Sequence, residues 1–142
     1  MTATQSIFSL VFIFSLFACQ KKSNINESLN GCYKYEAEGN TVTLKISIKE
    51  NTASGEIAHQ FVGKDSNSGT FQGIFYGDTL IADRTFVSEG LAGKDQIALL
   101  FTKNGFVEGY GEINPENGLP DLSKRNQIYF NEMWFLTKST CE

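Results

Sequence analysis

The sequence is poor in the residues that metal sites and nucleophilic active sites need, because it holds one histidine and three cysteines in 142 residues. Proline is also scarce, with two residues. The charge is weakly acidic, with 12 Lys and Arg against 16 Asp and Glu and a net charge of -4. That balance argues against nucleic acid as a partner. Hydrophobic residues make up 41% of the chain, a share that is ordinary for a globular protein. This share excludes a disordered or collagen-like chain.

No motif for nucleophilic catalysis is present. GxSxG does not occur, and the one histidine, His59, alternates with Ile57 and Phe61 as a core or rim residue does. Residues 65–69 (DSNSG) begin like a calcium loop, but the glycine comes one residue early and Tyr76 stands where the bidentate Glu belongs. We therefore expect a protein that is not an enzyme and that has no metal site and no cofactor.

Residues 7–18 (IFSLVFIFSLFA) form an apolar stretch without a charge. It is too short to span a bilayer, which takes about 20 residues, and it fits the apolar part of a secretory signal peptide. It runs into Leu16-Phe17-Ala18-Cys19, which resembles the lipobox of bacterial lipoproteins. The resemblance implies that residues 1–18 are a signal peptide and that Cys19 carries the lipid anchor (palmitate). The alternative is a short N-terminal anchor helix with a free cysteine.

Residues 19–30 continue as a polar stretch without periodicity, which predicts a flexible tether between the anchor and the folded domain. Lys21 and Lys22 stand directly after the anchoring cysteine. They are either attracted to anionic lipid headgroups or simply solvated parts of the tether.

From residue 31 onward the sequence alternates in short runs with period two. In residues 41–49 apolar and polar side chains alternate without a break, which is typical of a half-buried strand. No long stretch has the periodicity of a helix. We therefore predict a single all-β domain over residues 31–142, with eight strands at about 31–38, 41–49, 54–62, 69–76, 79–88, 95–103, 106–114 and 126–137.

The lengths of the connections predict a cup with a mouth. If the strands run up and down in order, the connections at one end are short: residues 50–53, 77–78 and 104–105. At the other end residues 39–40 form a tight turn, but residues 63–70, 89–94 and 115–125 predict long loops. The fold expected from this pattern is an eight-stranded antiparallel up-and-down barrel, closed at one end and ringed by loops at the other.

The barrel also predicts a disulfide between Cys32 and Cys141. Cys32 begins the first strand and Cys141 follows the eighth. These strands are neighbours in a closed barrel, which brings their ends within the Cα separation of about 7 Å that a disulfide requires. An exported protein meets an oxidising compartment. The alternative is two unrelated buried thiols.

Four segments, 31–33 (GCY), 69–73 (GTFQG), 77–83 (GDTLIAD) and 106–111 (FVEGYG), resemble small uncharacterised lipoproteins of the Bacteroidota type. The general plan also resembles lipocalin-like barrels. The resemblance implies the barrel and the anchor but no activity and no functional residue. In such lipoproteins acidic residues after the lipid-bearing cysteine accompany export to the cell surface. Lys21 and Lys22 therefore imply an outer-membrane anchor that faces the periplasm.

Alternation along the strands places charged and aromatic side chains on one face of the sheet. If Phe106 points into the barrel, Glu108 and Tyr110 point there as well. The opposite phase, which turns the apolar Val107 inward, makes these residues ordinary surface groups. In the inward phase an Arg and two Glu bind the polar end of a ligand while rings bind its apolar part. The candidate ligand-binding residues are Phe71, Phe75, Arg84, Phe86, Phe101, Glu108, Tyr110, Glu132 and Trp134.

Two functions fit this pattern. The first is a carrier or sensor that binds a small, mainly apolar molecule at the long-loop mouth. The second is a solid-cored barrel that binds another envelope protein, as an inhibitor or assembly factor, through residues 63–70, 89–94 and 115–125. We expect a monomer in both cases. An internal cavity distinguishes the two, because a carrier requires one and a solid barrel does not.

Overall fold

The computed structural model describes residues 25–142. The predicted signal peptide, Cys19 and the two lysines after it lie outside the described residues. Among residues 25–142 no helix is long and apolar enough to cross a membrane.

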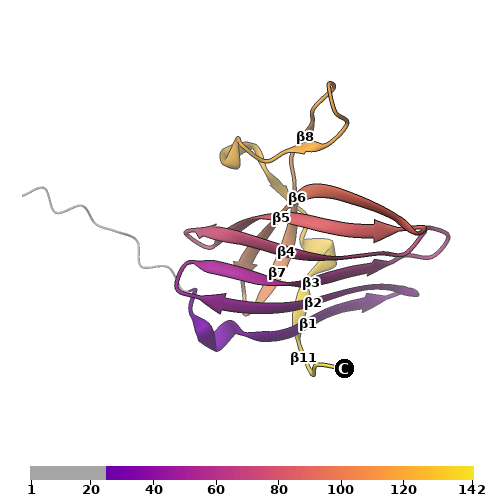
Figure 1. The fold of residues 1–142 in the computed structure, drawn as a ribbon. Helices are drawn as coiled ribbons and strands as arrows, with labels where there is room; N and C mark the ends of the chain where they lie inside the picture. Colours follow the sequence, from indigo (N-terminus) through magenta and orange to yellow (C-terminus); the bar gives the residue numbers. More distant parts are fainter. Residues whose placement is uncertain (1–24) are drawn as a thin grey trace, which may run out of the picture.

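The described residues form a closed antiparallel barrel of eight strands (Figure 1). Each of the first six strands pairs with the next along the chain. The last strand pairs with both β1 and β7 and so closes the ring. The prediction of an all-β, up-and-down, lipocalin-like barrel is thus confirmed. Its strands are β1 (Gly31–Ala37), β2 (Asn40–Lys49), β3 (Thr52–Gln60), β4 (Asn67–Tyr76), β5 (Thr79–Ser88), β6 (Leu91–Thr102), β7 (Gly105–Tyr110) and β11 (Leu136–Ser139).

The eighth strand lies further along the chain than predicted. Residues 126–135 were expected to be part of it, but they form two short 3-10 helices, η2 (Arg125–Gln127) and η3 (Glu132–Trp134), with the two-residue strand β10 (Tyr129–Phe130) between them. The side chain of Asn131 accepts a hydrogen bond from the backbone N–H of Met133, which starts η3 and ends the extended chain. The barrel is therefore closed by the four residues of β11.

Two of the connections also differ from the prediction. The expected long loop over residues 89–94 is a two-residue turn, because Glu89 and Gly90 both adopt positive φ (51° and 76°), as hairpin turns of this length require. β4 begins at Asn67, so the loop before it spans only residues 61–66. Three two-residue turns close one end, as predicted. The other end, called the mouth below, carries the loop 61–66 and the segment 111–135 together with two tight turns.

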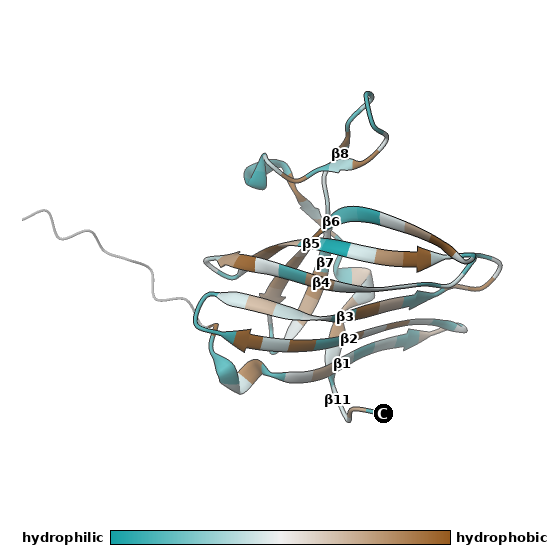
Figure 2. Cartoon of the chain, in the orientation of Figure 1, coloured by the Kyte–Doolittle hydropathy of each residue, from teal (hydrophilic) through white to brown (hydrophobic). Residues whose placement is uncertain are grey.

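An apolar core fills the interior of the barrel. The predicted alternation of β2 is confirmed, with Val42, Leu44, Ile46 and Ile48 buried and their neighbours turned outward. Figure 2 shows the same alternation of brown and paler residues along β2. The fully buried Phe106 receives the edge of the Tyr33 ring at 4.8 Å between centroids. Large apolar side chains thus occupy the space between the walls.

The segment 111–135 folds against the outer wall of the barrel. A second apolar cluster forms there, consisting of Ala98, Leu122 and Ile128 with Ile81 and Phe130 packed against it. β8 (Glu112–Ile113) pairs with β9 (Pro120–Asp121) in a separate small sheet that projects from the barrel in Figure 1. The apolar residues of 126–137 that suggested one strand thus divide, since Ile128 and Phe130 pack outside and Leu136 packs inside.

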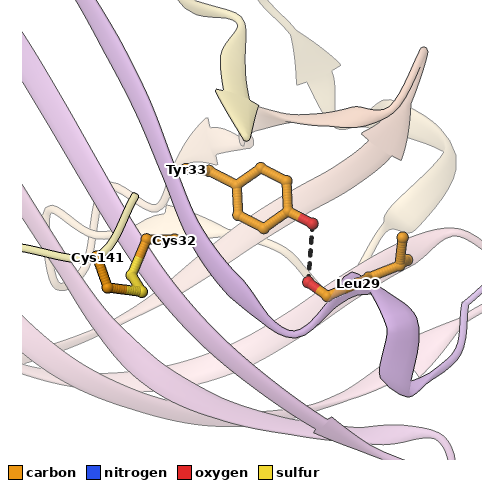
Figure 3. The surroundings of a disulfide bond; sticks show 4 residues. All are labelled: Leu29, Cys32, Tyr33 and Cys141. Atoms are coloured by element: carbon orange, nitrogen blue, oxygen red, sulfur yellow. Dashed lines mark hydrogen bonds between the residues drawn. A yellow bond between two sulfur atoms is a disulfide. The ribbon is translucent and has the colours of Figure 1, made fainter. Parts of the chain in front are cut away.

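The predicted disulfide is present between Cys32 and Cys141, with their Cα atoms 5.2 Å apart. Figure 3 shows it on the opposite side of β1 from Tyr33, whose hydroxyl donates to the backbone carbonyl of Leu29 at 2.7 Å. Leu29 belongs to the 3-10 helix η1 (Glu27–Leu29), which lies directly before β1. The chain therefore enters the barrel at the closed end, next to the disulfide.

Candidate functional site

A group of polar side chains lies on the inner face of the barrel, above the apolar core and toward the mouth. His59 is on β3, Arg84 on β5, Asp95 on β6, and Glu108 and Tyr110 on β7. Each lies two or four positions along its strand from a buried apolar residue of the core. Residues at that spacing share one face of a strand, so all five point inward. Arg84 and Glu108, with 8% and 7% of their surface exposed, are the only charged residues classed as buried among residues 25–142.

Arg84 is held rigidly by a neighbouring strand. Its Nε and Nη2 donate to the two carboxylate oxygens of Asp95 at 2.8 and 2.6 Å, in the parallel, two-bond geometry that favours arginine. Its Nη1 donates to the side-chain oxygen of Asn67 at 3.3 Å. The guanidinium also lies over the ring of Phe86, 4.9 Å from its centroid. All three guanidinium nitrogens are therefore engaged within the protein.

Glu108 is the centre of a second chain of hydrogen bonds. Its Oε1 lies 2.7 Å from Nε2 of His59, and its Oε2 accepts a hydrogen bond from the Tyr110 hydroxyl at 3.1 Å. Burial, reinforced by the negative charge of Glu108 and by this hydrogen bond, raises the pKa of Tyr110 well above its ordinary value. Tyr110 therefore keeps its proton and acts as a donor. A carboxylate only accepts, so Nε2 is the donor of the histidine contact.

This network forms the floor of a hollow of about 260 Å³ at the mouth. The rings of Phe61 and Trp134, with centroids 4.9 Å apart, form part of its wall. A second hollow of about 510 Å³ adjoins it over the loop 61–66, and His59, Phe61 and Arg84 line both. The arrangement offers an aromatic surface for the apolar part of a small molecule and a buried polar floor for its other end.

The structure brings several of the predicted ligand-binding residues together. Arg84, Glu108, Tyr110 and Trp134 all line the hollow, and Phe86 lies under the guanidinium. Glu108 and Tyr110 of β7 therefore point into the barrel, and the alternative prediction, in which they face solvent, does not hold.

Other predicted site residues lie elsewhere. Phe71 and Phe75 are buried in the apolar core, and Phe101 packs on Phe106 at 5.3 Å, so these rings fill the barrel instead of lining the hollow. The inward placement of Glu132 is wrong. The turn of η3 carries its side chain to the surface, where it is 67% exposed and accepts a hydrogen bond from Lys103 at 2.8 Å.

Four residues of the site, His59, Asp95, Asn67 and Phe61, were not predicted from the sequence to belong to it. Alternation with Ile57 placed His59 on the correct face, but nothing in the sequence indicated its partner. Asp95 lies directly across from Arg84 in the β5–β6 ladder. This pairing was not predicted, because residues 89–94 were expected to form a long loop. The two-residue turn at 89–90 sets the register that brings Asp95 opposite Arg84.

The raised pKa of Tyr110 predicts a pH dependence of stability. Above its ordinary value of 10.0 the unfolded chain loses the phenol proton while the folded protein keeps it. The folded state then binds more protons, so the free energy of unfolding falls as pH rises. We expect Tyr110→Phe to remove this contribution and to make the fall less steep in urea denaturation between about pH 9 and 12. Tyr129→Phe, at an exposed position, should leave the wild-type slope; parallel curves for all three proteins would contradict the assignment.

Within the described part of the chain, no three His, Cys, Asp or Glu side chains are grouped so that they could hold a metal ion. Comparison of the chain with protein families, with curated proteins and with solved structures found no match in any of the three.

Proposed function

We propose that the protein is a lipid-anchored lipoprotein of the bacterial envelope, without enzyme activity, that binds a small, mainly apolar molecule with one polar end at the mouth of its barrel. The anchor is Cys19, supported by the resemblance of residues 16–19 to a lipobox. The binding function is supported by one observation above all. A buried network of charged groups forms the floor of an open hollow that two aromatic rings help to line.

The cost of burying charge supports a binding role for the mouth. An interior that only needs to be filled is made of apolar side chains, as the core of this barrel is. Buried ion pairs add little net stability compared with apolar residues of similar size. The barrel nevertheless buries Arg84 and Glu108 next to open space. Polar groups fixed in this way orient a ligand and select it.

The packing of the core sets the depth at which the ligand binds. Phe71, Phe75 and Phe106 are buried in the apolar core, so the ligand lies at the mouth, against Phe61 and Trp134. A hollow of about 260 Å³ is slightly smaller than the usual range for drug-sized molecules, which begins near 300 Å³. The ligand is accordingly small or extends into the adjoining hollow.

The position of the tether supports an orientation on the membrane. η1 forms the last part of the predicted tether of residues 19–30, and it lies at the closed end, next to the disulfide. The mouth then faces away from the anchoring membrane. With Lys21 and Lys22 beside the anchor, we place the protein on the outer membrane facing the periplasm, as a monomer.

Native mass spectrometry of the full chain, extracted gently from its own envelope, tests the binding function. We expect a reproducible added mass that disappears on denaturation and that Trp134→Ala reduces strongly. Tyr129→Ala, an exposed aromatic position, serves as the matched control and should retain the added mass. A protein that carries no added mass in either the wild-type or the control form would contradict the proposal.

The second candidate, a solid-cored barrel that binds another envelope protein, is favoured by a different observation. Apolar side chains are exposed around the mouth and on the segment beside it, including Val62, Leu91 and Ile113. These residues lie in or next to the three loops expected to make such a contact. The same measurement distinguishes the two functions, because a protein partner adds several kilodaltons rather than the mass of a small molecule.

A further inference from the structure

The hydrogen-bond donors and acceptors at the floor of the mouth are unequally engaged, and this indicates the chemistry of the ligand. We propose that the polar end of the ligand is a positively charged donor, an organic ammonium group on a short aromatic or apolar body. This inference rests on the proposed binding function and specifies its ligand class.

Most donors of the floor are engaged within the protein. Three of the five N–H groups of Arg84 donate to Asp95 and Asn67, and the Tyr110 hydroxyl donates to Glu108. Only the second N–H of each Nη nitrogen is left for an anionic ligand, which would also lie beside the carboxylates of Asp95 and Glu108.

Acceptor capacity, in contrast, remains available. With Nε2 of His59 directed at Glu108, the other ring nitrogen, Nδ1, has no hydrogen-bond partner among residues 25–142. When the ring is neutral and Nε2 carries the proton, Nδ1 is an acceptor. Each carboxylate oxygen of Glu108 and Asp95 can also accept more than the one bond it has. A donor on the ligand completes these groups.

The charged groups that line the smaller hollow also favour a cationic ligand. Two carboxylates, Asp95 and Glu108, face one guanidinium, that of Arg84, and Glu108 also contacts His59. The carboxylates exceed the guanidinium by one in a nearly buried place, where a further positive charge is favoured over a further negative one. A cationic ligand balances the site.

The aromatic wall fits a cation as well as an apolar body. Phe61 and Trp134 line the same hollow as the two carboxylates. The face of an aromatic ring, tryptophan above all, attracts an ammonium group within about 6 Å of its centroid. The two rings can therefore contact both the ammonium group and the short apolar body of such a ligand.

Trp134 is the only tryptophan of the chain, so its fluorescence reports directly on the hollow. The full chain in mild detergent is titrated with three probes of similar shape: 2-phenylethylammonium, 2-phenylethanol and phenylacetate. We expect the ammonium to bind at least about tenfold more tightly than either of the others, as expected of a hydrogen bond to a charged group. Phenylacetate binding as tightly as the ammonium would overturn the inference.

Glu108→Gln removes the charge and keeps the shape, and it should abolish the preference for the ammonium. Glu56→Gln, at an exposed position on β3, is the matched control and should retain it. The comparison of the three probes on the wild-type protein stands even where the Glu108 variant fails to fold.

Two failures are distinguishable. Equal binding of all three probes to the wild-type protein overturns the ammonium preference and leaves the binding function in place. No binding of any probe, together with no added mass in native mass spectrometry, overturns both.

Discussion

Replacing both disulfide cysteines, Cys32→Ser with Cys141→Ser, should lower the free energy of unfolding by about 4 to 5 kcal/mol. The bond joins residues 109 positions apart, and a cross-link over such a long loop restricts the unfolded chain more than the folded one. The loss is expected because the oxidised unfolded chain has far fewer conformations than the open one. Urea denaturation of the wild-type and double-variant proteins measures it.

Both cysteines are replaced together because a single change leaves one unpaired thiol that could form other disulfides. Reduced wild-type protein is the control and should unfold at the same urea concentration as the double variant. Equal stability of the oxidised wild type and the double variant would show that the pairing of β1 with β11 holds the ring closed without covalent help.

Phe106→Ala should lower the free energy of unfolding by about 3 to 5 kcal/mol, the usual range for a large ring removed from a core. Phe106 has 0% of its surface exposed. Its ring packs on Tyr33 and Phe101, at 4.8 and 5.3 Å between centroids, and its backbone lies opposite Leu136 of the closing strand. The substitution would therefore leave a cavity beside the pairing of β7 with β11, which closes the barrel.

Tyr129→Ala is the matched control, since Tyr129 is 66% exposed and a surface change of this kind alters stability by less than about 0.5 kcal/mol. Thermal and urea unfolding of the two variants should differ clearly. A loss below about 1 kcal/mol for Phe106→Ala would mean that the walls collapse onto the space, and that the core is less rigid than its packing indicates.

The sequence predicted the barrel because its local signals agree with the final fold. In β2 each apolar residue is buried and each residue between them is turned outward, and a period of two admits no other arrangement. The two-residue turn at 77–78 was recognised from its glycine, and the turn before Gly105 was placed to within one residue. Barrel closure then determined the position of the disulfide.

The errors arose where long-range packing decides the structure. Ile128 and Phe130 carry the spacing of a strand, but their apolar side chains are buried against the outer wall by Leu122 and Ala98. Glu132 was predicted to share the inward face of a strand with Trp134, and that holds only if the chain is extended there. The loss of that strand therefore removed one predicted site residue.

The site itself could be predicted only in part. Alternation shows which residues of one strand share a face, and so it placed Glu108 with Tyr110. It does not show which residue of another strand lies opposite. The contacts of His59 with Glu108 and of Arg84 with Asp95 depend on the registers of four strands, and one misread turn is enough to lose a partner.

The shortness of the closing strand has a consequence for the order of events during synthesis. β11 is the last strand of the described chain, and its four residues pair with both β1 and β7. The ring therefore stays open until residues 136–139 have been synthesised, and contacts of such long range make folding slow. Until then Cys19, 13 residues before Cys32, is a nearer partner for its thiol than Cys141. Modification of Cys19 by lipid, as proposed, consumes the competing thiol, so that the anchor also protects the correct pairing.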